Sequence, residues 1–252
     1  MVHAVGNGLR LAVGTLTALP VRPPSHVDQH TARTAVLLAP PAALPLGLAV
    51  AAILWLTQLA GIHPLASGFL AVGVLALGSR AFHLDGLADT ADGLTASHDR
   101  ERSLAVMKSG TVGPAGVAAL IVVLGVQVVG FADLADEPLA AGALVLASRA
   151  ALALTCMRGI PAAVGEGLRG PFAGSLSAPL ALVRWFGAAA IAGLVFFLLG
   201  LPWQDVVMGF AIATVVVGLL IRRAVTRLGG VTGDIFGAAI ELTLATLLLA
   251  AA

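Results

Sequence analysis

Long apolar runs, separated by short polar segments, fill most of this chain. The runs show no alternation of apolar and polar residues, so they are typical of membrane-spanning helices and not of barrel strands. We therefore predict an all-α, polytopic helical membrane protein with about seven transmembrane helices. Their expected ranges are 36–59, 65–84, 113–131, 138–157, 180–200, 204–221 and 235–252.

The N-terminal region is less apolar than these runs. Residues 3–19 predict a short interfacial or membrane-dipping helix and not a full span, so six or eight spans remain alternatives. Residues 20–34 are polar and rich in proline, which favours a loop. With no internal repeat, residues 1–252 are expected to form a single integral-membrane domain. Three prolines are expected to kink the start of the first span: Pro40, Pro41 and Pro45.

Composition agrees with a membrane location. Hydrophobic residues make up 59% and charged residues 11% of the chain, whereas a soluble domain has about 25% charged residues. The net charge of +1 provides no basic surface for nucleic acid. The single cysteine, Cys156, excludes an internal disulfide and is interpreted as a small core residue.

The positions of Lys and Arg predict the orientation of the spans. Cytoplasmic loops of membrane proteins retain these residues, whereas outer loops lack them. Three loops of this chain contain neither, at 60–64, 132–137 and 200–203. We therefore expect the N-terminus and the basic segments on the cytoplasmic side, at 85–112, 158–179 and 224–234.

The polar segment His83–Gly93 contains the most informative pattern. Asp85, Asp89 and Asp92 are spaced i, i+4 and i+7, which places them on one face of a helix. Like charges so close together favour a bound divalent cation, and oxygen ligands favour Mg²⁺ or Mn²⁺. Such a metal commonly serves a phosphate-bearing substrate, although a solvated acidic loop is the alternative. His83 is a candidate phosphate or proton partner, or an interfacial polar residue.

A second glycine-rich segment precedes the last span. Gly229, Gly230 and Thr232 are typical of a nest of backbone N–H groups that binds phosphate at a helix start. Asp234 is a candidate catalytic residue and second metal ligand, or a helix N-cap. Glu241 lies two turns further on the same face, where a carboxylate usually faces a polar interior.

Two arginines lie within predicted spans. Arg80 and Arg149 each need a partner, and either a substrate phosphate or the aspartate cluster would serve. For Arg80 the alternative is that its side chain extends to the membrane interface.

The remaining candidates lie in predicted loops. Glu166 and Arg169 are candidate substrate ligands, or members of an ordinary cytoplasmic loop. Lys108 precedes the glycine-rich residues 110–116, which open the third span and either hold phosphate or form a plain loop-to-helix junction.

These motifs resemble the cobalamin synthase family, the adenosylcobinamide-GDP ribazoletransferases. Residues 83–93, His-Leu-Asp-Gly-Leu-Ala-Asp-Thr-Ala-Asp-Gly, are similar to the family's acidic signature throughout. Residues 228–234, Leu-Gly-Gly-Val-Thr-Gly-Asp, are similar to its later signature, and the Glu of its last span is matched by Glu241. Three shorter stretches also look like family landmarks: Leu16–Val21, Ser148–Arg149 and Glu166–Leu168.

The chain departs from the family pattern after the acidic segment. Many members carry Met-Lys/Arg-Asp-Ser-Arg-x-Gly there, whereas residues 107–113 read Met-Lys-Ser-Gly-Thr-Val-Gly. Because the Asp and Arg of that motif are missing, no role of that Asp is carried over to this chain.

The resemblance implies a reaction and a cofactor. α-Ribazole, or its 5′-phosphate, is joined to adenosylcobinamide-GDP with release of GMP, in the last step of cobalamin nucleotide-loop assembly. Mg²⁺ held by Asp85, Asp89 and Asp92 is expected to stabilise charge on the diphosphate, and an Asp of the cluster or Asp234 to accept the proton of the attacking hydroxyl. We expect a bacterial inner-membrane location with lipid contacts. The lower base, the preferred form of ribazole and assembly into a homo-oligomer are left open.

Two other classes of function remain as alternatives. A CDP-alcohol phosphotransferase or a prenyltransferase also uses Asp-rich motifs and Mg²⁺ on membrane helices. The former has differently spaced acids, and the latter typically has two Asp-rich motifs, of which the second is represented here by Asp234 alone. A metal or proton transporter would need ionisable residues near the middle of several spans, and only Arg149 and Glu241 qualify.

Overall fold

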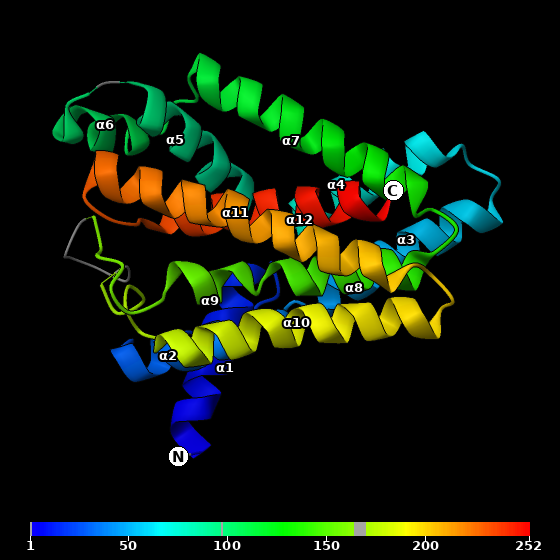
Figure 1. Cartoon of the computed structure of the whole chain (residues 1–252), viewed down its shortest axis with the longest axis horizontal. Helices are drawn as coiled ribbons and strands as arrows, with labels where there is room; N and C mark the ends of the chain where they lie inside the picture. The colour runs from blue at the N-terminus through cyan, green and yellow to red at the C-terminus, as the bar shows by residue number, and fades with distance from the viewer. Residues whose placement is uncertain (1, 97, 164–169) are drawn as a thin grey trace.

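The computed structural model describes residues 2–96, 98–163 and 170–252, and every regular element among them is a helix. The prediction of an all-α protein is therefore confirmed. The helices are α1 Val2–Leu16, α2 Gln29–Ala42, α3 Leu44–Leu59, α4 Pro64–Gly78, α5 Phe82–Ala96, α6 Arg100–Met107, α7 Pro114–Asp133, α8 Pro138–Ser148, α9 Ala151–Thr155, α10 Ala178–Leu198, α11 Trp203–Leu228 and α12 Gly233–Ala251 (Figure 1).

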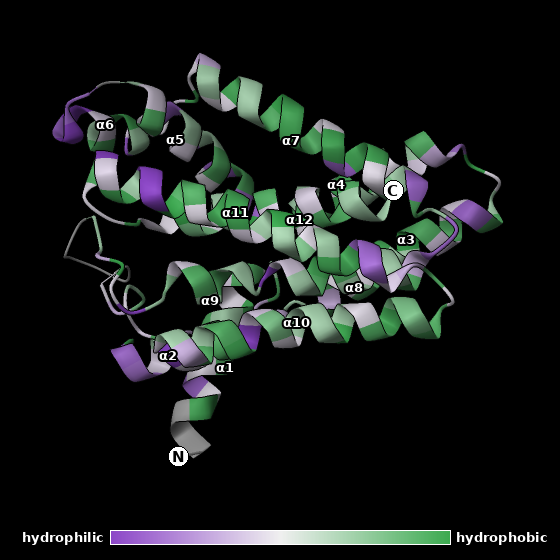
Figure 2. Ribbon diagram, viewed as in Figure 1, coloured by the Kyte–Doolittle hydropathy of each residue, from purple (hydrophilic) through white to green (hydrophobic). Residues whose placement is uncertain are grey.

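Six candidate spans among the described residues are long and apolar enough to cross a membrane, or seven if the bent pair α4–α5 counts as one span. This agrees with the predicted number of about seven. Apolar side chains such as Leu77, Ile121 and Leu198 are exposed on the outside of the bundle, where lipid would cover them. Figure 2 shows apolar residues along the long helices and hydrophilic residues mainly near helix ends.

The bounds of the first span differ from the prediction. Residues 20–34 were expected to be a loop, but α2 begins at Gln29 because Asp28 caps it. The Asp28 carboxylate accepts a hydrogen bond from the Thr31 backbone N–H, which holds the pKa of that carboxyl below its usual value. The helix is interrupted at Ala43, between α2 and α3 and beside the prolines that were expected to kink it.

The predicted span 65–84 is wrong in its last third, residues 79–84. α4 ends at Gly78, and α5 leaves at 93° to it after a break at residues 79–81. Arg80 and Ala81 form this corner with φ angles of 58° and 53°, a left-handed conformation that non-glycine residues seldom adopt. The apolar run is interrupted here by Gly78, Ser79 and Arg80, but the prediction extended the span across them.

α12 is the central helix of the bundle. It packs against α5, α7, α8, α9 and α11, and most of its length is buried. Because α5 lies directly on α12, the acidic segment and the start of the last span meet (Figure 1). The same end of the bundle includes α6, the start of α7 and the end of α11, so the fold gathers the predicted chemical motifs at one end.

Candidate functional site at one end of the bundle

The three aspartates lie on one helix, α5, as their spacing predicted. Their surroundings differ along that helix. Asp85 is exposed, Asp89 is partly buried, and Asp92 is only 6% exposed. The three carboxylates are therefore not equivalent, although one pattern predicted them.

Asp92 is bound to the start of α7. Its Oδ2 accepts a hydrogen bond of 2.6 Å from the Gly113 backbone N–H, and its Oδ1 accepts one of 2.8 Å from the Gly116 backbone N–H. These N–H groups lie in the first turn of a helix, where they have no partner within the helix itself. The carboxylate of Asp92 thus occupies the position in which the sequence predicted a phosphate.

Glycine leaves room for the Asp92 carboxylate at both of these positions. A Cβ atom at Gly113 would lie 2.6 Å from Oδ1 of Asp92, and one at Gly116 would lie 2.5 Å from Oδ2. These distances are well below van der Waals contact, so a side chain would displace the carboxylate. The glycine-rich start of α7 is explained by an internal contact between helices.

Asp234 lies beside α5. A Cβ atom at Gly86 would lie 2.8 Å from the backbone oxygen of Asp234, and one at Gly237 would lie 3.0 Å from that of His83. The two glycines thus let the backbones of α5 and α12 touch. As a result, Asp85, the neighbour of Gly86 in the chain, belongs to the same small region as Asp234.

The N-cap of α12 is Thr232 and not Asp234. The hydroxyl group of Thr232 accepts a hydrogen bond from the Ile235 backbone N–H and donates one to Oδ2 of Asp234 at 3.1 Å. Asp234 lies in the first turn, where the positive end of the helix favours a negative charge. The interpretation of Asp234 as an N-cap is therefore wrong, and its role as a metal ligand stays a prediction.

The loop between α11 and α12 is tightly fixed. Gly229 ends α11 with a φ of 76°. The Arg100 side chain lies over this glycine. It donates a hydrogen bond from Nε to the Leu228 carbonyl and one from Nη2 to the Ala163 carbonyl. A Cβ at Gly230 would lie 2.4 Å from the Pro161 backbone oxygen. These two glycines serve close backbone packing, and the structure provides no separate indication that they bind phosphate.

The other predicted substrate ligands are scattered. Nη2 of Arg80 donates a 2.5 Å hydrogen bond to the Gly14 carbonyl, which ties the α4–α5 corner to α1. Lys108 is exposed and ends α6. Glu166 and Arg169 lie outside the described residues.

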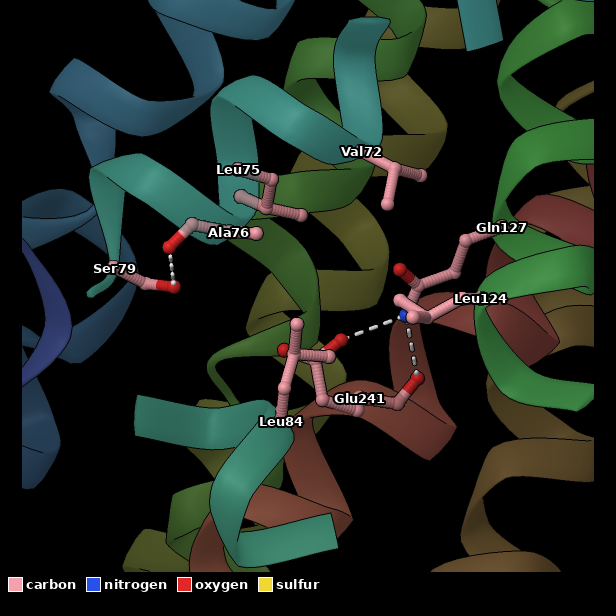
Figure 3. A pocket seen from close by; sticks show the side chains of 8 residues that line it. All are labelled: Val72, Leu75, Ala76, Ser79, Leu84, Leu124, Gln127 and Glu241. Atoms are coloured by element: carbon pink, nitrogen blue, oxygen red, sulfur yellow. Dashed lines mark hydrogen bonds between the residues drawn. The ribbon is translucent and has the colours of Figure 1, made fainter. Parts of the chain in front are cut away.

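The membrane interior of the bundle contains a second polar group. His83, Arg149 and Glu241 are each at most 3% exposed, and they come from α5, the α8–α9 junction and α12. Gln127 of α7 donates a 2.7 Å hydrogen bond to the Glu241 carboxylate (Figure 3). A cavity of about 10 Å³ beside Gln127 and Glu241 has room for about one water molecule and is far too small for a nucleotide.

A larger hollow of about 580 Å³ opens at the end of the bundle. It is lined by Asp99, Arg100, Glu101 and Leu104 at the start of α6. The hollow is open and is lined by the start of α6 alone, and it contains none of the predicted site residues.

The donors at this end fit a magnesium ion. Within the described part of the chain, no three His, Cys, Asp or Glu side chains form a ready metal cluster. Magnesium, however, is commonly bound by one or two carboxylates together with substrate phosphates. Asp85 and Asp89 on α5 and Asp234 on α12 carry carboxylate oxygens of this kind, and each oxygen of Asp92 accepts a backbone N–H group.

Sequence reasoning missed Arg100 and Gln127. Arg100 was seen only as one of several loop cations, and nothing local indicates that it closes the α11–α12 loop. Gln127 had a usable signal, because it is a long polar side chain within a predicted span, and such residues usually face a polar partner.

Comparison with known proteins decides the family. The family model described as cobalamin-5-phosphate synthase matches residues 8–252, almost the whole chain. The chain belongs to this family. A relative from Nocardioides sp., named adenosylcobinamide-GDP ribazoletransferase, is 54% identical over 96% of each chain. The family resemblance predicted from the two motifs is confirmed.

Other relatives carry the same name. The one from Frankia casuarinae is 36% identical over 95% of this chain and 92% of its own. The one from Bradyrhizobium diazoefficiens is 34% identical over 91% and 87%. No solved structure matches the chain.

Proposed function

We propose that this protein is a membrane-embedded adenosylcobinamide-GDP ribazoletransferase that joins α-ribazole, or its 5′-phosphate, to adenosylcobinamide-GDP and releases GMP. The family match over nearly the full length supports this activity. The family match favours the transferase function over that of a CDP-alcohol phosphotransferase, a prenyltransferase or a transporter. The observation that carries the proposal is the contact of Gly86 with Asp234, which joins the two family motifs into one region.

The reaction needs charge stabilisation at a diphosphate. A ribose hydroxyl of the ribazole attacks the phosphorus attached to cobinamide, the bond to the GMP phosphate breaks, and GMP leaves with the bonding electrons. Mg²⁺ supplies neutralisation of the diphosphate charge when it is bound. Asp85, Asp89 and Asp234 are the residues that would hold it.

The chain's own residues orient the reactants. The first turn of α12, fixed by Thr232 and by Arg100 across the preceding loop, presents backbone N–H groups next to Asp234. Such a helix start favours an anion. A carboxylate of this region that is not engaged by the metal would accept the proton of the attacking hydroxyl.

The site is proposed to face the cytoplasm. The basic residues at this end include Arg100, Arg102, Arg222 and Arg223, and positively charged loops are retained on the cytoplasmic side. The location in a bacterial inner membrane follows from the same proposal.

A direct assay tests the function. Detergent-purified protein is given adenosylcobinamide-GDP and α-ribazole, with and without Mg²⁺, and GMP release is measured. Release that needs both Mg²⁺ and ribazole supports the proposal. Release without ribazole would indicate hydrolysis, and no release from folded protein would contradict the transferase function.

A further inference from the structure

The corner between α4 and α5 contains two residues with an unfavourable backbone conformation. α4 ends in a Schellman-type turn, in which the Ala81 N–H donates to the Ala76 carbonyl at 2.7 Å. The Arg80 N–H donates to the Leu77 carbonyl at 3.1 Å. Arg80 stands where such a turn usually has glycine, with a φ of 58°, and Ala81 follows with a φ of 53°. Non-glycine residues keep the left-handed conformation only where other contacts hold them, so the corner needs support from elsewhere in the fold.

The end of α1 supplies this support through two reciprocal hydrogen bonds. Nη2 of Arg80 donates to the Gly14 carbonyl at 2.5 Å, and the Ala18 backbone N–H donates to the Gly78 carbonyl at 2.6 Å. Gly14 and Gly78 each lie in the last turn of a helix, where backbone carbonyls have no partner within the helix itself. The C-terminal ends of α1 and α4 thus satisfy each other's open carbonyl groups. The Arg80 cation also complements the negative end of the α1 dipole.

The corner determines where α5 begins. The Asp85 N–H donates to the Ala81 carbonyl at 2.9 Å, and Asp85 lies in the first turn of α5. The next residue, Gly86, lies against α12, where a Cβ atom would come within 2.8 Å of the Asp234 backbone oxygen. Because about one helical turn separates the corner from Asp85, a change in the direction of the corner would move Asp85 relative to Asp234.

We propose that the end of α1 braces the α4–α5 corner through its two hydrogen bonds, and that this brace positions Asp85 beside Asp234. The proposal rests on the proposed transferase function only for its effect on turnover. α1 packs mainly against α2 and contributes none of the predicted site residues, so it acts on the reaction only through the corner. Arg80 is accordingly a positioning residue, which binds a backbone carbonyl and not the substrate.

Thermal unfolding in detergent tests the brace without an assay of activity. Glycine relieves the unfavourable backbone conformation at either corner position, but only at Arg80 does it also remove a side-chain hydrogen bond. Ala81→Gly is therefore the matched control and is expected to raise the melting temperature by about 2 °C. Arg80→Gly is expected to melt at least about 4 °C below Ala81→Gly, because it loses a hydrogen bond from a charged donor. Equal melting temperatures of the two variants would overturn the brace.

GMP release by the same variants tests the positioning of Asp85. Arg80→Gly is expected to lower kcat by at least about fivefold, with the KM for adenosylcobinamide-GDP within about twofold of the wild type. It is also expected to raise the Mg²⁺ concentration at half-maximal rate by at least about threefold, a quantity that a loss of folded protein alone would not change. Arg80→Lys keeps a cationic donor and is expected to recover at least about half of the loss in kcat. Ala81→Gly should keep the wild-type values.

Two outcomes of the kinetic measurements would contradict the proposal. An unchanged Mg²⁺ requirement and kcat in Arg80→Gly would show that the corner does not place the acids. A raised KM for adenosylcobinamide-GDP with an unchanged Mg²⁺ requirement would make Arg80 a substrate ligand. A wild-type protein that releases no GMP would instead overturn the proposed function, and the comparison of melting temperatures would still decide whether the brace exists.

Discussion

The starts of α7 and α12 are both glycine-rich helix N-termini at the same end of the bundle, yet they are built differently. At α7, the carboxylate of Asp92 accepts hydrogen bonds from the Gly113 and Gly116 backbone N–H groups. At α12, the cap is the hydroxyl group of the chain's own Thr232, and Asp234 stands in the first turn. The first is an internal junction between helices, whereas the second is where we propose that the substrate anion and the metal bind.

The difference assigns separate roles to acids that share one motif. A carboxylate whose two oxygens each accept a backbone N–H group is held in a fixed position, with about two of its roughly four acceptor positions occupied. Asp92 therefore fixes α5 to α7, and we propose Asp85 and Asp89 as the residues of α5 that take part in the reaction. Glycine next to an acidic motif is evidence of close packing as much as of phosphate binding.

The largest effect is expected from substitution of Asp85, the acid of α5 that we place beside Asp234 of α12. Asp85→Ala is expected to reduce turnover by at least about 100-fold with little change in melting temperature, because the exposed carboxylate stabilises charge and not the fold. GMP release and thermal unfolding are measured on the same preparation. Asp205→Ala is the matched control and should keep its activity. Asp205 lies in the first turn of α11, at the opposite end of α11 from the candidate site. Equal losses in both variants would contradict the assignment.

Loss of the contact between Asp92 and the start of α7 is expected to lower the stability of the protein. Asp92→Ala removes two hydrogen bonds to a charged acceptor and leaves two N–H groups without their partner, which costs about 3 kcal/mol. The melting temperature in detergent should fall by roughly 6–12 °C. A variant that unfolds like the wild type but loses activity would instead place Asp92 among the reacting groups.

Crowding the same junction should have a smaller effect. Gly116→Ala places a Cβ atom 2.5 Å from the Asp92 carboxylate, and we expect a loss of about 1–2 kcal/mol. Gly125→Ala in the same helix is the control, because its Cβ would meet nothing within 4 Å. Denaturation of both variants checks this, and equal stability of the two would mean that the junction tolerates a side chain.

The smallest expected effect is at the cap of α12. Thr232→Ala removes the side-chain cap and is expected to cost about 1 kcal/mol. It should also lower turnover modestly, because Asp234 loses the hydrogen bond from Thr232. Thr226→Ala, on the exposed side of α11, is the control and should be nearly neutral. A neutral Thr232→Ala would show that the Arg100 contact alone holds this loop.

Much of the fold could be predicted because apolar runs specify helices in a membrane. The spans at 113–131 and 180–200 differ from α7 and α10 by only one or two residues at each end. The α4–α5 corner was missed although Gly78, Ser79 and Arg80 interrupt the apolar run there, because the run resumes at once and the change of direction is not local. It is held by long-range contacts, such as the hydrogen bond from Arg80 to Gly14, which no local pattern contains.

The candidate site was predictable in its members and less so in their arrangement. Spacing alone placed Asp85, Asp89 and Asp92 on one helix face. It did not reveal that the start of α7 would donate hydrogen bonds to Asp92, because that contact depends on which helix packs beside the last turn of α5. The predicted partner for Arg149 was a phosphate or the aspartate cluster, whereas in the fold Arg149 is fully buried and donates to the Val145 carbonyl and to Ser148 Oγ.

The most direct test of the division between the two helix starts is a magnesium titration of GMP release in Asp85→Asn and Asp92→Asn. The concentration of Mg²⁺ at half-maximal rate does not depend on how much protein is folded. We expect Asp85→Asn to raise it by at least about tenfold, as loss of a metal ligand does, and Asp92→Asn to leave it within about twofold of the wild type. An equal rise in both variants would show that Asp92 holds the metal and would contradict the account.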